Sequence, residues 1–185
     1  MHSLGVLFIY SRRFLVDNKL FFNKDLVISE DNLFVKKALL QCQSVATTDF
    51  VHYYYDCTTE SLMRTKSIEQ RTQRAVKKLL ALSELRDIYD TLDDNELKSL
   101  LMDDLVGEYL HIVLYGCFYR KQYRDLIDKS FLRKHALTRF NKMRIAFYNA
   151  HPCFYYYVFR LYIMMRENRL FFSVNRLVKK CLLSG

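Results

Sequence analysis

Glycine and proline are almost absent from this chain, and their scarcity limits the folds open to it. The 185 residues include four Gly and one Pro. Both residues are poor helix formers that punctuate loops and hairpins, so a chain without them is typical of a structure dominated by helices. Because 51% of the residues are hydrophobic, the chain can build a core and wholesale disorder is excluded. The length corresponds to one domain, or to one small domain with an appendage.

The cysteines and the start of the chain indicate a reducing compartment. The five Cys are an odd number, are widely spaced and form no C-x-x-C pair. This pattern predicts free, mostly buried thiols rather than a metal cluster or a disulfide framework. The apolar run at residues 4–10 is short and is followed by Arg12 and Arg13, which is not the pattern of a signal peptide. We therefore expect a cytoplasmic protein.

The first third of the sequence predicts both strands and a helix. Residues 4–10 form a continuous apolar run that fits a buried strand, and residues 17–29 have the pattern of a loop. A helix is expected to begin after Ser29, as the N-cap, with Glu30 and Asp31 in its first turn, and to end near Gln43. Residues 44–56 alternate and contain β-branched side chains and tyrosines, which predicts a second strand.

From about Ser67 onward the apolar spacing predicts helices alone. The change from a mixed pattern to a helical one divides the chain into residues 1–62 and residues 63–185. The side chains that mark the helical faces are Val76, Leu79, Leu80 and Ser83; Leu97, Leu100, Leu101, Leu105, Tyr109, Val113 and Cys117; and Phe140, Met143 and Phe147. A further helix is expected from Cys153 to Arg166, after a break near His151-Pro152, and a last one from Phe171 to Leu182.

The positive charge of the protein is concentrated in its last third. Residues 120–185 hold fifteen Lys and Arg against three Asp and Glu, whereas residues 1–119 hold fourteen against seventeen. A tail of one sign indicates an anionic surface as its partner, either lipid headgroups or nucleic acid.

Aromatic and basic residues are interleaved in this tail. The apolar part from Cys153 to Met165 is shorter than the roughly 20 residues that cross a bilayer and contains Arg160. Such a segment suits the interface of an anionic membrane, and a helical hairpin whose aromatic face packs on the upstream helices explains it equally well. Nucleic-acid binding is the least favoured alternative, because no known motif accompanies the pattern. The candidate membrane-surface residues are Arg160, Arg166, Arg169, Lys179 and Lys180.

A series of features in residues 5–62 resembles one enzyme family. The aromatic and basic stretch Tyr10–Leu15 and the segment Asn18–Phe22 precede the acidic pair Glu30-Asp31, and Tyr53–Tyr55 and then Ser61 follow it. In this order they resemble the second half of the catalytic domain of inverting glycosyltransferase family 2, which has the GT-A fold. Members of this family act in the synthesis of bacterial surface polysaccharides. The resemblance implies an α-rich α/β fold: a GT-A remnant of one or two strands and a helix, followed by an all-helical region.

The resemblance implies a catalytic role for the acidic pair. Asp31 would be the base that takes the proton from the acceptor hydroxyl, and Glu30 would help to shape the acceptor site. The first turn of a helix directs such a carboxylate, and the helix dipole favours its ionised form. Without the flanking pattern, Glu30 and Asp31 are better explained as favourable first-turn acids, which are common where helices start.

Five more residues are candidates for substrate or metal binding. Arg12 and Arg13 could bind a diphosphate through their guanidinium groups, or form a solvated pair at the end of a strand. Tyr54 and Tyr55 could stack on a sugar ring, although alternate rings of such a strand belong to the core. His52 is a candidate metal ligand, because a metal-binding His sits near this place in some relatives.

The donor half of such an enzyme has no counterpart in the sequence. In the family an Asp-x-Asp motif holds Mg²⁺ or Mn²⁺ against the nucleotide-sugar diphosphate, and nothing before residue 30 matches it. The pairs Asp93-Asp94 and Asp103-Asp104 have the pattern of helix caps and solvated faces. The complete enzyme would have the donor site that this chain lacks. It would use a nucleotide sugar, a glycan acceptor and the metal. We therefore expect the chain alone to bind no cofactor and to be inactive.

A second hypothesis assigns the chain no catalysis. It would be a helical module that binds either the inner face of the plasma membrane or a partner protein. The apolar strand predicted at residues 4–10 would also lack sheet neighbours, and an unpaired strand favours a homodimer.

Overall fold

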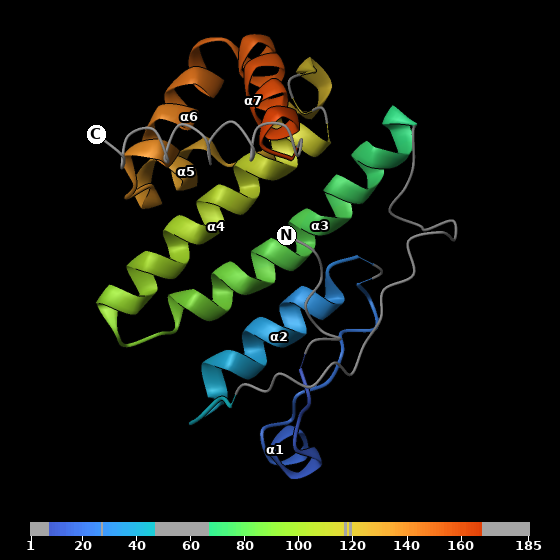
Figure 1. The fold of residues 1–185 in the computed structure, drawn as a ribbon, viewed down its shortest axis with the longest axis vertical. Coiled ribbons are helices and arrows are strands. Elements are labelled where there is room, and N and C mark those ends of the chain that lie inside the picture. The colour runs from blue at the N-terminus through green and yellow to red at the C-terminus, as the bar shows by residue number, and fades with distance from the viewer. Residues whose placement is uncertain (1–7, 27, 47–66, 117, 119, 168–185) are drawn as a thin grey trace, which may run out of the picture.

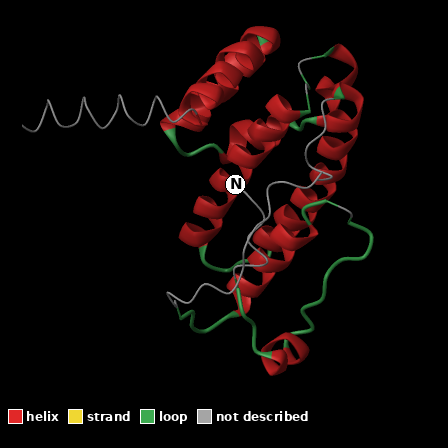
Figure 2. Ribbon diagram, turned by 45° about the vertical axis from the view of Figure 1, so that its right-hand side comes forward, coloured by secondary structure: helices red, strands yellow, loops and turns green. Residues whose placement is uncertain are grey.

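The described part of the chain is built from helices. The computed structural model describes residues 8–26, 28–46, 67–116, 118 and 120–167, and 74% of the described residues are helical with no strand among them (Figures 1 and 2). The elements are α1 (Arg12–Asp17), α2 (Glu30–Gln41), α3 (Ile68–Asp90), α4 (Asn95–Tyr115), the 3-10 helix η2 (Lys121–Leu126), α5 (Lys129–His135), α6 (Arg139–Ala150) and α7 (Pro152–Glu167).

The predicted α/β fold, as a remnant of a GT-A domain, is therefore wrong for these residues. The end of the first predicted strand, residues 8–10, pairs with no other segment. Instead the ring of Tyr10 packs edge-on against Phe34 of α2, with the ring centroids 5.2 Å apart. Aromatic side chains here contact a helix, and this packing replaces the backbone pairing that a strand needs. Residues 44–46 form no strand either, while residues 1–7 and 47–56 lie outside the described part.

A serine precedes each of the first two helices, but only one of the two caps its helix through the side chain. Ser11 caps α1, because its hydroxyl accepts the N–H of Phe14 at 3.5 Å, so Arg12 and Arg13 open a helix rather than end a strand. Helix α2 begins after Ser29 and carries Glu30 and Asp31 in its first turn, as predicted. Ser29 itself has a left-handed backbone with φ of 67° and makes no capping hydrogen bond through its side chain.

Helices α3 and α4 lie side by side and run obliquely across the middle of the fold (Figure 1). Ser67 caps α3 by accepting the N–H of Gln70, and Asp94 caps α4 by accepting the N–H of Leu97 at 2.9 Å. Only residues 91–94 join the two helices, and so short a connection favours antiparallel neighbours. The predicted face of α3 is partly wrong, since Leu80 and Ser83 are exposed and the buried side chains include Ala75, Leu82 and Leu85.

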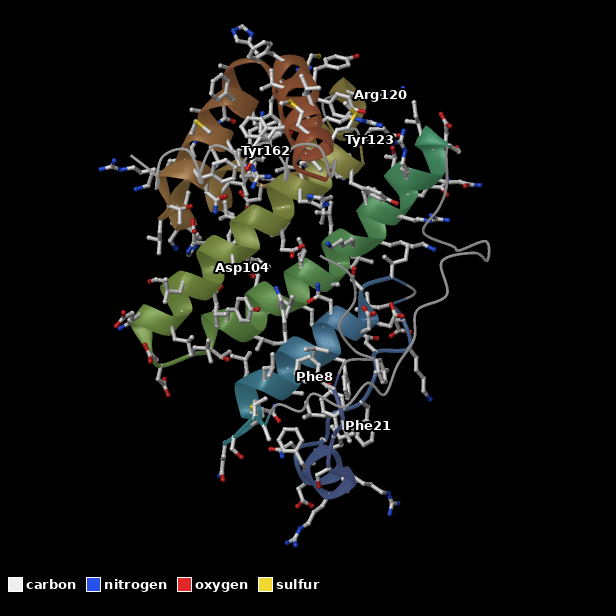
Figure 3. All side chains as sticks on the ribbon, in the orientation of Figure 1. Phe8, Phe21, Asp104, Arg120, Tyr123 and Tyr162 are labelled. Carbon is white, nitrogen blue, oxygen red and sulfur yellow. The ribbon has the colours of Figure 1, made fainter. Side chains whose placement is uncertain are left out.

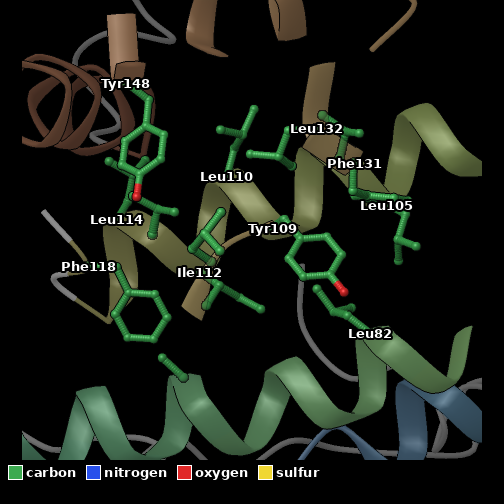
Figure 4. Close-up of a cluster of buried hydrophobic side chains, with 14 of the residues drawn as sticks. Leu82, Leu105, Tyr109, Leu110, Ile112, Leu114, Phe118, Phe131, Leu132 and Tyr148 are labelled. Carbon is green, nitrogen blue, oxygen red and sulfur yellow. The ribbon is translucent and has the colours of Figure 1, made fainter. Parts of the chain in front are cut away.

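Helix α4 is the centre of the molecule. It contacts α3 on one side and α5, α6 and α7 on the other. Its buried residues cover rather more than half of the helix surface, as expected for an element with neighbours on several sides. Figure 4 shows this cluster, in which Leu105, Leu110 and Ile112 are completely buried.

The helices after α4 lie together on the side of α4 that faces away from α3, from about Asp103 onward (Figure 1). Only His151 separates α6 from α7, and Pro152 opens α7, where its missing N–H and fixed φ are tolerated. The break predicted at His151-Pro152 is therefore confirmed, whereas the sequence analysis missed η2 and α5. The predicted helix from Phe171 to Leu182 lies outside the described residues.

Ion pairs attach α2 to the helices that follow it. Lys37 of α2 forms an ion pair with Glu84 of α3, and Lys36 donates to a carboxylate oxygen of Asp104 on α4 at 3.2 Å. The predicted division of the chain at residues 62 and 63 lies outside the described part. Of the cysteines, Cys42 is a half-buried free thiol and Cys153 an exposed one, so the prediction of buried thiols fails for Cys153.

Candidate functional site

The outward side of α6 and α7 is unusually apolar. Helix α7 buries one stripe, Tyr155, Tyr156 and Phe159, and Ile163 is partly buried against the core. Most of its other apolar side chains are exposed, because no other helix of the described part covers them. We call the following set, each at least 40% exposed, the outer face: Phe140, Met143 and Phe147 of α6, with Phe154, Tyr157, Val158, Leu161, Tyr162, Met164 and Met165 of α7. Large exposed apolar patches are typical of interaction surfaces.

The outer face is continuous across the two helices. Phe140 of α6 lies 6.3 Å from Tyr162 of α7, and Phe147 lies 6.2 Å from Phe154, measured between ring centroids. Both α6 rings also contact Phe159, which lies beneath them in α7. These contacts fix the aromatic rings of α6 and α7 relative to one another. The rings of the two helices therefore form one continuous surface.

Basic side chains lie near the outer face, and the one acidic residue of α6 and α7 is Glu167 at the end of α7. Between Asp128 and Glu167 the sequence contains eight Lys and Arg and neither Asp nor Glu. The exposed basic side chains among them are Arg133 and Lys134 of α5, Arg139 and Lys142 of α6, and Arg160 of α7. Arg160 donates a hydrogen bond to the hydroxyl of Tyr156, which holds its guanidinium beside α7.

A groove of about 570 Å³ adjoins the outer face, between α3, α4, α6 and α7. Phe140 and Tyr162 belong to both, and Figure 3 labels Tyr162 on α7 and Asp104 on α4 at this groove. Two of its carboxylates are paired with lysines. Glu108 accepts from Lys78 at 2.9 Å, and Asp104 accepts from Lys36 at 3.2 Å.

Buried polar side chains connect α4, α6 and α7 at the base of the groove. Asp103 is only 7% exposed, and one carboxylate oxygen accepts the N–H of Leu137 at 2.7 Å and the side-chain amide of Asn141 at 3.0 Å. Arg144 donates to the carbonyl oxygen of Asn141 at 3.5 Å and to the hydroxyl of Tyr155 at 3.2 Å. The network fixes the position of α6 and α7 on α4.

The hydrogen bonds to Asp103 keep its carboxylate ionised. Burial alone would raise the pKa of Asp103, but the bonds from Asn141 and from the backbone N–H groups of Leu137 and Thr138 outweigh it, so the pKa is lowered from its ordinary 3.8. A lowered pKa in the folded state means that the ionised form stabilises the fold above pH 3.8. That stability is lost as the pH falls below 3.8 through the pKa of the folded protein.

We predict that Asp103→Asn destabilises the protein in a pH-dependent way. Near neutral pH the variant should lose about 1.5 to 3 kcal/mol of unfolding free energy, which is typical of hydrogen bonds to a charged group. The difference from the original protein should shrink as the pH falls from 3.8 through the lower pKa of the folded protein, because Asp103 is protonated first in the unfolded chain and then in the folded one. Urea unfolding at several pH values measures it, and a difference that does not change with pH would contradict this account.

The acidic pair predicted as catalytic lies away from both surfaces. Glu30 and Asp31 are half-buried in the first turn of α2, and a carboxylate oxygen of Asp31 accepts the N–H of Asn32 at 2.6 Å. Arg12 and Arg13 are exposed on α1, where Arg13 pairs with Asp17 at 3.4 Å. These two arginines line a shallow hollow, but Glu30 and Asp31 are not among its lining residues, so the structure does not bring the four together.

Most of the other predicted site residues lie outside the described residues. His52, Tyr54, Tyr55, Arg169, Lys179 and Lys180 lie outside the described residues, and Arg166 is placed only as a residue of the last turn of α7. Within the described part no group of three His, Cys, Asp or Glu side chains could hold a metal ion. No helix in the described ranges is long and apolar enough to cross a membrane.

The sequence analysis missed the polar network although a signal for it was present. Asp103 occupies the stripe of Val106, Leu110 and Val113, where every other position is apolar and buried. An acid at such a position needs hydrogen-bond partners from another element. On α6 the residues predicted to mark the packed face, Phe140, Met143 and Phe147, are exposed, and the buried stripe instead contains Asn141 and Arg144.

Comparison with known proteins found no match to a family model, to a curated protein or to a solved structure. The function is therefore argued from the surfaces described above.

Proposed function

We propose that this chain is a non-catalytic helical module that binds an anionic membrane surface through the outer face of α6 and α7. The observation that carries this proposal is the coincidence of two properties on the same helices. A continuous aromatic and methionine-rich surface is exposed there, and the charged residues of α6 and α7 are basic except for Glu167, the last residue of α7. The polar network beneath supports it, because it holds α6 and α7 against α4 as one unit.

Charge complementarity favours a lipid surface over a neutral partner. Each Lys or Arg close to an anionic membrane contributes about 1 kcal/mol, and the three basic side chains Arg139, Lys142 and Arg160 flank the outer face. Aromatic and aliphatic side chains of an interfacial helix enter the boundary between headgroups and acyl chains. The module would lie on the membrane, in keeping with the expected place on the inner face of the plasma membrane.

Sugar transfer remains a prediction from the resemblance alone. No contact among the described residues favours it, because Glu30 and Asp31 line neither the groove nor the hollow on α1. The nucleotide sugar, the glycan acceptor and the metal accordingly have no place in this proposal.

Sedimentation with vesicles tests the proposal. The chain should bind vesicles that contain phosphatidylserine and should bind pure phosphatidylcholine vesicles much more weakly. Binding should weaken as salt is raised, because the Debye length falls from about 10 Å at 0.1 M to about 3 Å at 1 M. Asp31→Asn serves as the control and should bind like the original protein. Equal binding to both kinds of vesicle, or none to either, would contradict the proposal, and capture of an acidic protein without vesicle binding would point to a protein partner instead.

A further inference from the structure

Arg144 is a buried cation without an anionic partner in the described part of the chain. It is 8% exposed, and none of the ion pairs among the described residues includes it. The hydrogen bonds it donates go to neutral oxygens, those of Tyr155 and Asn141. Burying a charge is costly unless it is paired, so a guanidinium in this position is suited to a ligand that supplies the missing negative charge.

Of the cations that line the groove in the described part, Arg144 is the one that no carboxylate pairs with, so it can bind an anionic ligand. Asp104 and Glu108 are each paired with a lysine, and Asp103 is occupied by the N–H groups of α6 and the turn before it. The guanidinium of Arg144 also lies 5.4 Å from the centroid of the Phe140 ring and 5.9 Å from that of Phe159. The rings hold the planar group in place and provide an apolar wall next to it.

We infer that the groove binds a phosphate group, held by the guanidinium of Arg144, with an apolar part of the same ligand against Phe140, Phe159 and Tyr162. A guanidinium presents its N–H groups in a fixed fork that matches phosphate oxygens. The volume of about 570 Å³ is large enough for a headgroup or another small phosphate ester.

The position of the groove favours a lipid phosphate as the source. Phe140 and Tyr162 line the groove and also belong to the outer face, so a headgroup whose acyl chains contact that face would lie next to Arg144. This choice of source rests on the proposed membrane binding. The phosphate site itself does not, because a soluble phosphate ester would use the same guanidinium.

Two measurements on the full chain test the inference. The first follows the N–H of the Arg144 side chain by NMR in arginine-labelled protein while glycerol phosphate is added, with Arg144→Lys assigning the signal. The second compares vesicles containing phosphatidic acid, which exposes a phosphate monoester, with phosphatidylserine vesicles of matched surface charge. We expect a shifted Arg144 signal and roughly tenfold tighter binding to phosphatidic acid, the size expected of a charge-assisted hydrogen bond.

The Arg144→Lys variant separates this inference from the proposed function. Lysine keeps the charge but lacks the fork, so the preference for phosphatidic acid over phosphatidylserine should disappear. The ratio of the two affinities is the quantity compared, because Arg144 also belongs to the polar network that holds α6 and α7 on α4, and a loss of that support lowers both affinities alike. A shifted signal without any vesicle binding would support the phosphate site with a soluble ligand, and would contradict the membrane proposal. If glycerol phosphate leaves the Arg144 signal unchanged and phosphatidic acid is not preferred, the inference is overturned whatever the variant does.

Discussion

Replacing two exposed apolar residues of α7 should nearly abolish vesicle binding while leaving the fold intact. Tyr157 and Leu161 are 63% and 52% exposed and stand one helical turn apart on the outer face. Tyr157→Gln with Leu161→Gln keeps the helix, because glutamine is a good helix former. Full burial of such a side chain contributes about 1.5 to 3 kcal/mol, so two partly inserted side chains account for a roughly 30- to 100-fold loss of affinity.

The matched control removes the same kind of residue elsewhere. Leu80 of α3 and Leu97 of α4 are 59% and 41% exposed and do not belong to the outer face. Leu80→Gln with Leu97→Gln should bind vesicles like the original protein, as measured by sedimentation at one lipid composition. Equal losses in both double variants would mean that exposed apolar residues act without regard to position, and the assignment to α6 and α7 would fail.

The largest effect on stability is expected for Leu110→Ala. Leu110 is completely buried in α4, and its carbonyl accepts the hydroxyl of Tyr155 from α7, so it lies where the central helix supports the outer face. Truncating a buried leucine to alanine removes transfer free energy and leaves a cavity, which together lower the free energy of unfolding by about 2 to 5 kcal/mol. Small domains have only about 5 to 15 kcal/mol in total.

Urea unfolding measures this change as a lower midpoint at an unchanged slope. Leu80→Ala is the control, because Leu80 is mostly exposed on α3 and the variant should stay within about 0.5 kcal/mol of the original protein. A loss below about 1 kcal/mol for Leu110→Ala would contradict the packing around α4, since cavities in well-packed cores are more costly than this.

The helices were predictable from the sequence to the extent that local signals define them. The break before α7 follows from Pro152, whose preference acts within one turn, and α3 begins close to Ser67, where the apolar spacing becomes helical. Helix α2 begins after Ser29 as predicted, although Ser29 makes no capping hydrogen bond through its side chain. The strand predicted at residues 4–10 failed at its described end, because an apolar run does not specify its partner. There the rings of Phe8 and Tyr10 pack with each other, and Tyr10 packs on Phe34 of α2.

The direction of the helical faces was less predictable than the helices themselves. Phe140, Met143 and Phe147 have the spacing of a packed stripe, yet they are exposed, while Asn141 and Arg144 are buried beside them. Hydrophobic spacing identifies a face but does not distinguish one that contacts the core from one that contacts a partner. The polar network could not be predicted for a related reason, because it joins Asp103 to Asn141 across 38 positions of sequence.

The most direct test of membrane binding places a reporter within the outer face. The chain contains no tryptophan, so a single Tyr157→Trp provides an unambiguous fluorescence signal. Added vesicles containing phosphatidylserine should shift its emission to shorter wavelength, because the indole enters the apolar boundary of the bilayer. Leu97→Trp on α4 should show no shift. An unchanged emission from the residue 157 reporter, or an equal shift from both reporters, would contradict the claim that the outer face of α6 and α7 enters the membrane.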